Sequence, residues 1–155
     1  MPEPCIPPAT STLSLMNRPI IALVPHADTA APQQPAQRQP LCNSADLVNA
    51  SIAVPFDVLY AGQTCRAFAI RFEGHVHAYL NRCAHVAMEM DWQPNQFFDD
   101  TGQWLLCSTH GAAYRPATGE CGGGPCTGGL VKITLTEERG VVYWHTAHNL
   151  KPVEF

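Results

Sequence analysis

Two short pairs of cysteine and histidine constrain this chain more than any other feature of its sequence. The first pair is Cys83 and His85, separated by one residue, and the second is Cys107 and His110, separated by two. Between the pairs lie 107 − 85 − 1 = 21 residues. Thiolates and imidazoles are side chains that bind iron and zinc in proteins. We therefore expect the fold to bring two loops together around a metal centre.

A donor set of two cysteines and two histidines changes the chemistry of a binuclear iron–sulfide core. Four thiolates make the oxidised core dianionic, whereas two thiolates and two neutral imidazoles leave it uncharged. An electron enters an uncharged core more readily, so histidine ligation raises the reduction potential. The imidazole N–H groups can also titrate when the iron changes its oxidation state. The donor set therefore favours a centre that transfers single electrons.

A structural zinc site is the main alternative for the same four side chains, because Cys₂His₂ suits tetrahedral zinc. Zinc sites usually place about two to four residues between cysteines and about three to five between histidines. The pair Cys83 and His85 encloses a single residue. A catalytic Cys–His dyad is also disfavoured, since a second matched pair would have no role. We expect iron and sulfide, with a zinc module as the alternative.

The first 44 residues differ in composition from the rest of the chain. Nine of the fourteen prolines lie in the first forty positions, and charged residues there are few. The segment from Ala31 to Gln37 is of low complexity and has little apolar surface to bury. We predict a disordered tail over residues 1–44, followed by one domain over residues 45–155.

The pattern from residue 45 onward predicts a small all-β domain. Period-2 alternation and β-branched or aromatic residues favour strands, and Glu73-Gly74 predicts a tight turn between two of them. Proline places the first strand near a sheet edge. The predicted strands are Ser51–Pro55, Arg66–Phe72 paired with His75–Leu80, and Leu130–Leu135 paired with Val141–Trp144. A short helix is expected between Val86 and Trp92.

Glycines gather just downstream of the second Cys–His pair, between Gly119 and Gly129. Glycine permits sharp bends and close approach of the backbone to other groups. Cys121 and Cys126 flank a Gly-Gly-Gly-Pro sequence in this segment. They could form a disulfide or remain free thiols, and a reducing compartment favours free thiols. We expect reduced thiols without a ligand role.

Charge and hydropathy exclude several classes of protein. The formal net charge is −4 and no basic stripe is present, which argues against a nucleic-acid partner. No apolar run reaches the roughly 18 residues that a membrane helix needs. The N-terminus lacks a basic region followed by a continuous apolar core, so we expect a cytoplasmic protein without a membrane partner.

The motif Cys-x-His followed by Cys-x-x-His-Gly resembles the signature of Rieske [2Fe–2S] domains, and of soluble Rieske-type ferredoxins in particular. The resemblance covers about residues 50–145. It implies an antiparallel β-sandwich with a small cluster-binding subdomain carried on two loops. It also implies that Cys83 and Cys107 bind one iron of a single cluster, and that His85 and His110 bind the other.

Residues around the two pairs extend the resemblance. Gly111 matches the glycine that follows the second histidine, and Gly124-Pro125 looks like the family's proline loop, which shields the cluster. Tyr114 supplies a phenol where the family often has an aromatic ring. Ala112 departs from high-potential members, which have a serine hydroxyl there, and the ligand loops lack their extra pair of cysteines. These departures imply a lower potential.

The resemblance implies a one-electron carrier, the ferredoxin component that exchanges electrons with a reductase and an oxygenase or another oxidoreductase. A small subunit of a multisubunit reductase, similar to assimilatory nitrite reductase, is the alternative. Eleven residues follow Trp144, so we expect no mononuclear iron domain in this chain. The acidic loop residues Glu89, Asp91, Asp99 and Asp100 have two interpretations. They form a solvated loop, or they form a docking face for a basic partner.

Overall fold

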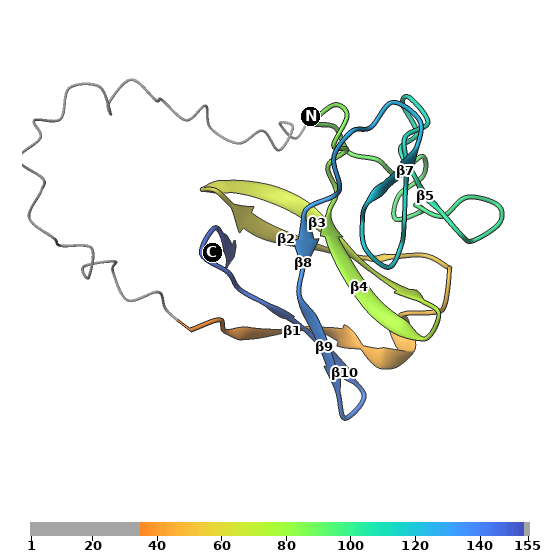
Figure 1. The fold of residues 1–155 in the computed structure, drawn as a ribbon. Coiled ribbons are helices and arrows are strands. Elements are labelled where there is room, and N and C mark those ends of the chain that lie inside the picture. Colours follow the sequence, from red (N-terminus) through yellow and green to blue (C-terminus); the bar gives the residue numbers. More distant parts are fainter. Residues whose placement is uncertain (1–34, 154–155) are drawn as a thin grey trace, which may run out of the picture.

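The computed structural model describes residues 35–153, and strands dominate this part of the chain (Figure 1). Apart from a 3₁₀ helix of three residues, η4 (Ser44–Asp46), the described residues contain no helix. The strands are β1 (Arg38–Asn43), β2 (Val54–Tyr60), β3 (Gln63–Phe72), β4 (His75–Leu80), β5 (Leu105–Leu106), β6 (Ala113–Tyr114), β7 (Cys121–Gly123), β8 (Lys132–Ile133), β9 (Leu135–Glu138), β10 (Val141–His145) and β11 (Leu150–Pro152). The all-β prediction is confirmed. The expected tail falls largely on residues 1–34, outside the described residues.

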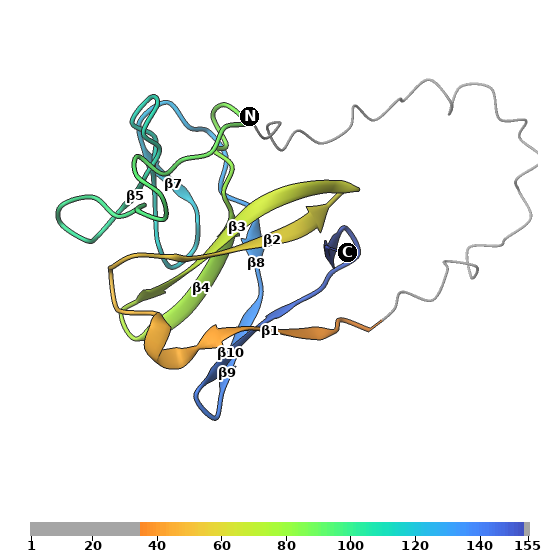
Figure 2. The ribbon, with the colours of Figure 1, turned by 180° about the vertical axis from the view of Figure 1, so that it is seen from behind.

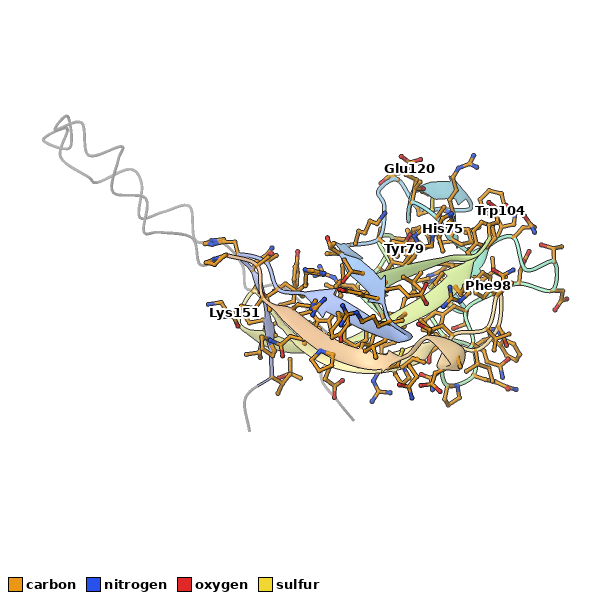
Figure 3. The ribbon with its side chains drawn as sticks, turned by 90° about the horizontal axis from the view of Figure 1, so that it is seen from below. His75, Tyr79, Phe98, Trp104, Glu120 and Lys151 are labelled. Carbon is orange, nitrogen blue, oxygen red and sulfur yellow. A yellow bond between two sulfur atoms is a disulfide. The ribbon has the colours of Figure 1, made fainter. Side chains whose placement is uncertain are left out.

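The strands form three antiparallel sheets. A five-stranded sheet has the order β11-β2-β3-β4-β8, and a three-stranded sheet has the order β1-β10-β9. A small sheet, β5-β6-β7, lies beyond one end of this sandwich, on the far side from the β9–β10 hairpin (Figures 1 and 2). Figure 3 shows Trp104 and Glu120 at this end of the molecule and Lys151 at the opposite end. Within residues 35–153, no helix has the length and apolarity required to cross a membrane.

Strand β3 is buried on both of its faces. Ala67 and Ala69 belong to the core that the five-stranded sheet shares with β10. Phe68 and Ile70 point the other way, into the core beneath the small sheet. The Phe68 ring stacks on that of Phe97, with ring centroids 3.7 Å apart. Small side chains on one face let the two sheets approach, and large ones on the other support the small sheet.

The predicted hairpin over residues 66–80 is confirmed. Glu73 and Gly74 turn the chain with φ values of 50° and 82°, the left-handed pair that a type I′ hairpin turn requires. The second predicted hairpin divides differently. Its first arm splits into β8, which pairs with β4, and β9, which pairs with β10 through a turn at Arg139 and Gly140. One chain segment thus connects the two sheets of the sandwich.

The structure moves the start of the domain to an earlier residue than predicted. Residues 38–43, which the composition placed in the tail, form β1 and pair with β10 from Arg38 opposite His145 to Asn43 opposite Val141. Leu41 and Cys42 pack against the core between the sheets. The prediction of disorder to residue 44 is therefore wrong for these positions. Their order comes from a partner strand about a hundred residues away in the chain, which local composition does not reveal.

Arg71 links the start of the domain to the central sheet. From β3, its guanidinium donates hydrogen bonds to the carbonyls of Leu47 (2.8 Å) and Ser44 (3.2 Å). It also forms an ion pair with Glu137 of β9, and the two side chains are 16% and 32% exposed. Hydrogen bonds from Arg71 lower the pKa of Glu137 below its usual value of 4.5. The pair therefore stabilises the packing of the two sheets.

The first prediction concerns this ion pair. Glu137→Gln should lower the free energy of unfolding near neutral pH by roughly 1 kcal/mol, because it removes a partly buried charge-assisted hydrogen bond. A carboxylate with a lowered pKa stabilises the fold above about pH 4.5, and this contribution is lost as the pH falls. The difference in urea unfolding between wild type and variant should therefore be present at pH 7 and shrink as the pH is lowered below about 4.5.

Glu138→Gln is the matched control. Glu138 pairs with Arg38, but these side chains are 54% and 47% exposed, and exposed pairs contribute little. A difference between wild type and Glu137→Gln that persists undiminished at low pH would contradict this assignment.

Candidate metal centre

Each Cys–His pair follows a strand at the same end of the molecule. Cys83 lies three residues beyond the end of β4, and Cys107 directly follows β5. Both cysteines are only 2% exposed, whereas His85 and His110 are exposed. The structure therefore brings the four predicted ligand residues to one loop cluster, with the sulfurs inside and the imidazoles at the surface.

The like side chains of the two pairs meet each other. The Cys83 and Cys107 side chains lie close enough for each thiol to shift the pKa of the other. The rings of His85 and His110 lie edge to face, with centroids 5.0 Å apart and an interplanar angle of 87°. The site consequently offers one pair of sulfurs and one pair of imidazoles.

The two buried thiols have different electrostatic environments. Burial raises the pKa of Cys107. Burial also opposes ionisation of Cys83, but hydrogen bonds from the Tyr114 hydroxyl and from the backbone N–H groups of Val86 and His85 outweigh it and lower the pKa of Cys83. A thiolate is the form that binds metal. The backbone of the first loop is thus arranged to stabilise a negative sulfur.

Tyr114 connects the small sheet to the first Cys–His pair. Its side chain is fully buried, and its hydroxyl lies 3.1 Å from the Cys83 sulfur. The same hydroxyl accepts a hydrogen bond from the backbone N–H of Ala84 at 2.9 Å. Burial raises the pKa of Tyr114, so the phenol keeps its proton and can donate it toward the sulfur. The predicted phenol therefore lies at the site.

Asn81 holds the two ligand loops together, and sequence reasoning assigned it no role. It is the buried polar residue of the described chain, 2% exposed. Its amide donates to Asp91 (2.9 Å) and accepts a hydrogen bond from the backbone N–H of Met90 (2.7 Å). The carbonyl of Met90 in turn accepts from the backbone N–H of Ser108, at 2.9 Å, in the second loop. An asparagine directly after a strand is typical of turns, so its burial could not be inferred locally.

The short helix expected between Val86 and Trp92 is absent, and that prediction is wrong. This segment is an irregular loop in which the backbone N–H of Cys83 bonds to the carbonyl of Met88 at 2.8 Å. The backbone turns back on itself and so places Cys83 and His85 in the loop cluster. A helix over these residues could not form the hydrogen bond between Cys83 and Met88.

Two of the four acidic loop residues have structural partners. Asp91 accepts hydrogen bonds from Asn81 and from the backbone N–H of Asn95. Asp99 accepts from the Thr101 hydroxyl (2.8 Å) and from backbone N–H groups that follow it. Glu89 and Asp100 remain exposed. The acidic character of this loop therefore serves the local fold as well as the surface.

Gly124 brings the glycine-rich segment into contact with the second ligand loop. Its φ is +77°, and a Cβ at this position would lie 2.7 Å from the carbonyl oxygen of Gly111 and 2.9 Å from the Cα of Ala112. Gly111 directly follows His110 in the sequence. The predicted covering segment therefore lies against the site, and only glycine fits at its point of contact.

Cys121 and Cys126 form a disulfide, with Cα atoms 5.8 Å apart. The prediction of reduced thiols is wrong for this structure. The strand β7 and the turn that follows it place the two side chains within bonding distance. The argument from compartment concerned average redox conditions and could not detect this local geometry. Neither cysteine is placed as a ligand.

The donor set fits a [2Fe–2S] cluster. Such a cluster with mixed ligation needs two sulfurs on one iron and two imidazoles on the other, and the structure offers these pairs. A mononuclear zinc site needs three or four ligands around one ion. Within residues 35–153, no group of three or more His, Cys, Asp or Glu side chains has that arrangement.

Comparison with known proteins agrees with this geometry. Residues 37–149 match the family model of the Rieske [2Fe–2S] domain. The chain belongs to the Rieske family. A Rieske domain carries one [2Fe–2S] cluster, so the predicted cofactor and the predicted family are both confirmed.

Several solved structures share the fold. The ferredoxin of carbazole 1,9a-dioxygenase from Nocardioides aromaticivorans IC177 is 18% identical with a TM-score of 0.56, over 70% of this chain and 96% of the ferredoxin. A chain in a complex of reduced oxygenase and oxidized ferredoxin of carbazole 1,9a-dioxygenase is 21% identical with a TM-score of 0.55, over 76% of this chain and 97% of that one. The terminal oxygenase from Novosphingobium sp. KA1 is 23% identical with a TM-score of 0.51.

The match to that oxygenase spans 70% of this chain but only 29% of the oxygenase chain. No curated protein matches the sequence. These structural matches establish the fold of the Rieske domain.

Gly124→Ala provides a test of the close contact at the Rieske site. The added methyl group would meet the backbone of the second ligand loop at a positive φ, so we expect a loss of roughly 1–3 kcal/mol in the free energy of unfolding. Gly123→Ala is the matched control, because nothing lies within 4 Å of a Cβ there and its φ is not in the left-handed range. Equal melting temperatures for the two variants would contradict the contact.

Proposed function

We propose that this Rieske protein is a one-electron carrier whose cluster is held by Cys83 and Cys107 on one iron and by His85 and His110 on the other. The observation that carries the proposal is the asymmetry of the site. Two sulfurs are 2% exposed, while both imidazoles are exposed at the same loop cluster. A centre that exchanges electrons with another protein needs such a surface contact on one side and protection from water on the other.

When bound, the [2Fe–2S] cluster supplies a site that accepts and releases one electron. The residues of the chain provide the rest of the mechanism. Cys83 and Cys107 anchor the site in the apolar core, where the Tyr114 hydroxyl stabilises the charge on sulfur. His85 and His110 face outward and shorten the path to a partner. Gly124 and Pro125 limit the access of water. No substrate is transformed in this mechanism, which is outer-sphere transfer.

The surface around the histidines supports a protein partner. Val86 and Met88 follow His85 and are 40% and 43% exposed, so apolar side chains border the exposed imidazole. Glu89 lies beside them and is exposed. Apolar contact with a charged margin is typical of transient protein–protein interfaces. These features support docking of a partner with a basic margin over the imidazoles.

We propose that the chain acts as a ferredoxin that receives electrons from a reductase and delivers them to an oxygenase. A structurally similar chain belongs to a complex of oxygenase and ferredoxin, and the match covers nearly all of that chain. A role as the small subunit of a multisubunit reductase is the alternative. Association with a larger reductase in a stable complex would favour the alternative, whereas isolation as a separate carrier would favour the ferredoxin. The cytoplasmic location stays a prediction.

The ligand assignment predicts a specific result for His110→Ala. The wild-type protein, purified without oxygen, should contain about two irons and two acid-labile sulfides per chain, and its reduced EPR spectrum should show the lower mean g-value of nitrogen ligation. His110→Ala should lose the cluster, because one iron loses half of its protein ligands.

His145→Ala is the control for that variant. His145 lies on β10 and bonds to Thr136 at 2.9 Å, far from the loop cluster. It should leave iron content and spectrum unchanged. Stoichiometric zinc in the wild type would support the zinc module, and an unaltered spectrum in His110→Ala would refute the ligand assignment.

Tyr114→Phe should lower the midpoint potential while the cluster remains bound. The lost hydrogen bond stabilises negative charge on the Cys83 sulfur, and the reduced cluster carries more of that charge. If the hydrogen bond is stronger by about 1–1.5 kcal/mol in the reduced state, its loss corresponds to roughly 40–65 mV for one electron. Tyr79→Phe is the matched control, since its buried hydroxyl bonds instead to the carbonyl of Pro116 at 2.7 Å. Equal potentials in the two variants would contradict this role.

A further inference from the structure

We propose that the Cys121–Cys126 disulfide is a site of thiol–disulfide exchange, and that its reduction by a dithiol loosens the segment that covers the cluster. We call the segment Cys121–Cys126 the cover loop. This inference rests on the proposed function, because the cover loop belongs to the same site. It adds a chemical modification to that site and a way to change the lifetime of the cluster.

The disulfide closes the cover loop into a covalent ring. The two cysteines are five positions apart and enclose Gly122, Gly123, Gly124 and Pro125. Three consecutive glycines give the open chain more conformational freedom than any other residues would. Strand β7 contributes only three residues, and its register against β6 is irregular. A covalent ring therefore removes freedom that short-range hydrogen bonding restricts weakly.

The cover loop contacts both halves of the proposed cluster site. Gly124 lies against Gly111 and Ala112, directly after His110. Cys121 is paired in the small sheet with Tyr114, whose hydroxyl reaches the Cys83 sulfur. Cys126 is 7% exposed and belongs to the same core cluster as Cys83 and Cys107. A change in the cover loop can therefore reach the second Cys–His pair by direct contact and the first pair through Tyr114.

The two cysteine residues differ in their exposure, which favours one of them as the target of an attacking thiolate. Cys126 is buried, whereas Cys121 is partly exposed and lies next to exposed Gly122. Gly124 and Pro125 are also exposed. Attack therefore falls on the Cys121 sulfur, with Cys126 as the leaving group, because exchange requires direct approach to one sulfur.

The exchange balances in two steps with a dithiol as reductant. A thiolate of the dithiol attacks the Cys121 sulfur, the bond between the two sulfurs breaks, and the Cys126 thiolate leaves and takes up a proton. The second thiol of the reductant then attacks the mixed disulfide and releases Cys121 as a thiol. The protein gains two electrons and two protons, and the dithiol becomes a cyclic disulfide.

Opening the ring should expose the cluster to water and to small solutes. The oxidised cluster with this donor set is uncharged and the reduced one is anionic, so water favours the reduced form and raises the midpoint potential. Freer motion of the cover loop also increases the rate at which the cluster is lost, because local opening precedes release. The disulfide thus connects the thiol redox state of the surroundings to the electron carrier.

The test uses the holoprotein, purified without oxygen, with dithiothreitol as the dithiol probe. Peptide mapping should find Cys121 and Cys126 not alkylated before dithiothreitol treatment, because they are disulfide-bonded, and alkylated after it. Loss of the visible absorption in the presence of an iron chelator should become several-fold faster after reduction, and the midpoint potential should rise. Modification of both cysteines before treatment, or an unchanged rate of cluster loss after their reduction, would overturn the proposal.

Two variants separate this effect from other actions of the dithiol. The double variant Cys121→Ser/Cys126→Ser should lose its cluster at the fast rate with or without dithiothreitol. Cys42→Ser removes a free cysteine from β1 and should respond like the wild type. A dithiol effect that persists in the double variant counts against the proposal.

Failure of the proposed function gives a different result. If the purified protein contains zinc or no metal, the proposal of an electron carrier and the proposed effect of the disulfide on the cluster are both refuted. Peptide mapping of Cys121 and Cys126 then still decides whether the exchange reaction occurs.

Discussion

The packing of strand β3 on two different cores determines where the first Cys–His pair lies. One face presents Ala67 and Ala69 to the sandwich, and the other presents Phe68 and Ile70 to the residues beneath the small sheet. A strand that is buried on both faces cannot shift by one residue without exchanging alanine for phenylalanine in both cores. The end of the adjacent strand β4, and with it the first Cys–His pair, is therefore held in a defined position. Tyr79 reinforces this contact because its hydroxyl bonds across to Pro116.

The two loops depend on each other for their conformation. Asn81 links the first loop to Met90, and the carbonyl of Met90 links it to Ser108 in the second. Tyr114 returns from the small sheet to Cys83 and Ala84. Each buried polar group that forms the site thus has a partner, as the apolar surroundings require. The two cysteines lie inside this network and are buried, whereas the two imidazoles stand outside it and are exposed.

The parts of the fold that sequence reasoning predicted depend on residues close together in the chain. The Cys–His pairs and the Glu73-Gly74 hairpin are local patterns with few alternatives, and each lies where the pattern placed it. Strand β1 was not predicted, because Pro40 and the glutamines around it have low strand propensity. These residues form a strand only by pairing with distant β10. The role of Asn81 and the Cys121–Cys126 bond were not predicted for a similar reason. The burial of one side chain and the distance between two others are set by the folded chain and not by neighbouring residues in the sequence. The roles of the four ligand residues stay a prediction.

The cover loop contains both flexible glycines and a disulfide that restricts them. Only glycine can occupy position 124, because a Cβ would collide with the backbone of Gly111 and the φ is positive. A run of glycines satisfies that requirement, but it also increases the entropy that ordering the segment must overcome. The Cys121–Cys126 bond lowers this cost by restricting the open chain, and it does so beside the site without using a ligand side chain. Reduction of the bond would remove this restriction without changing any of the four predicted ligand residues. The cover loop therefore combines glycine, which the close approach of two backbones requires, with a covalent ring that offsets the flexibility of glycine.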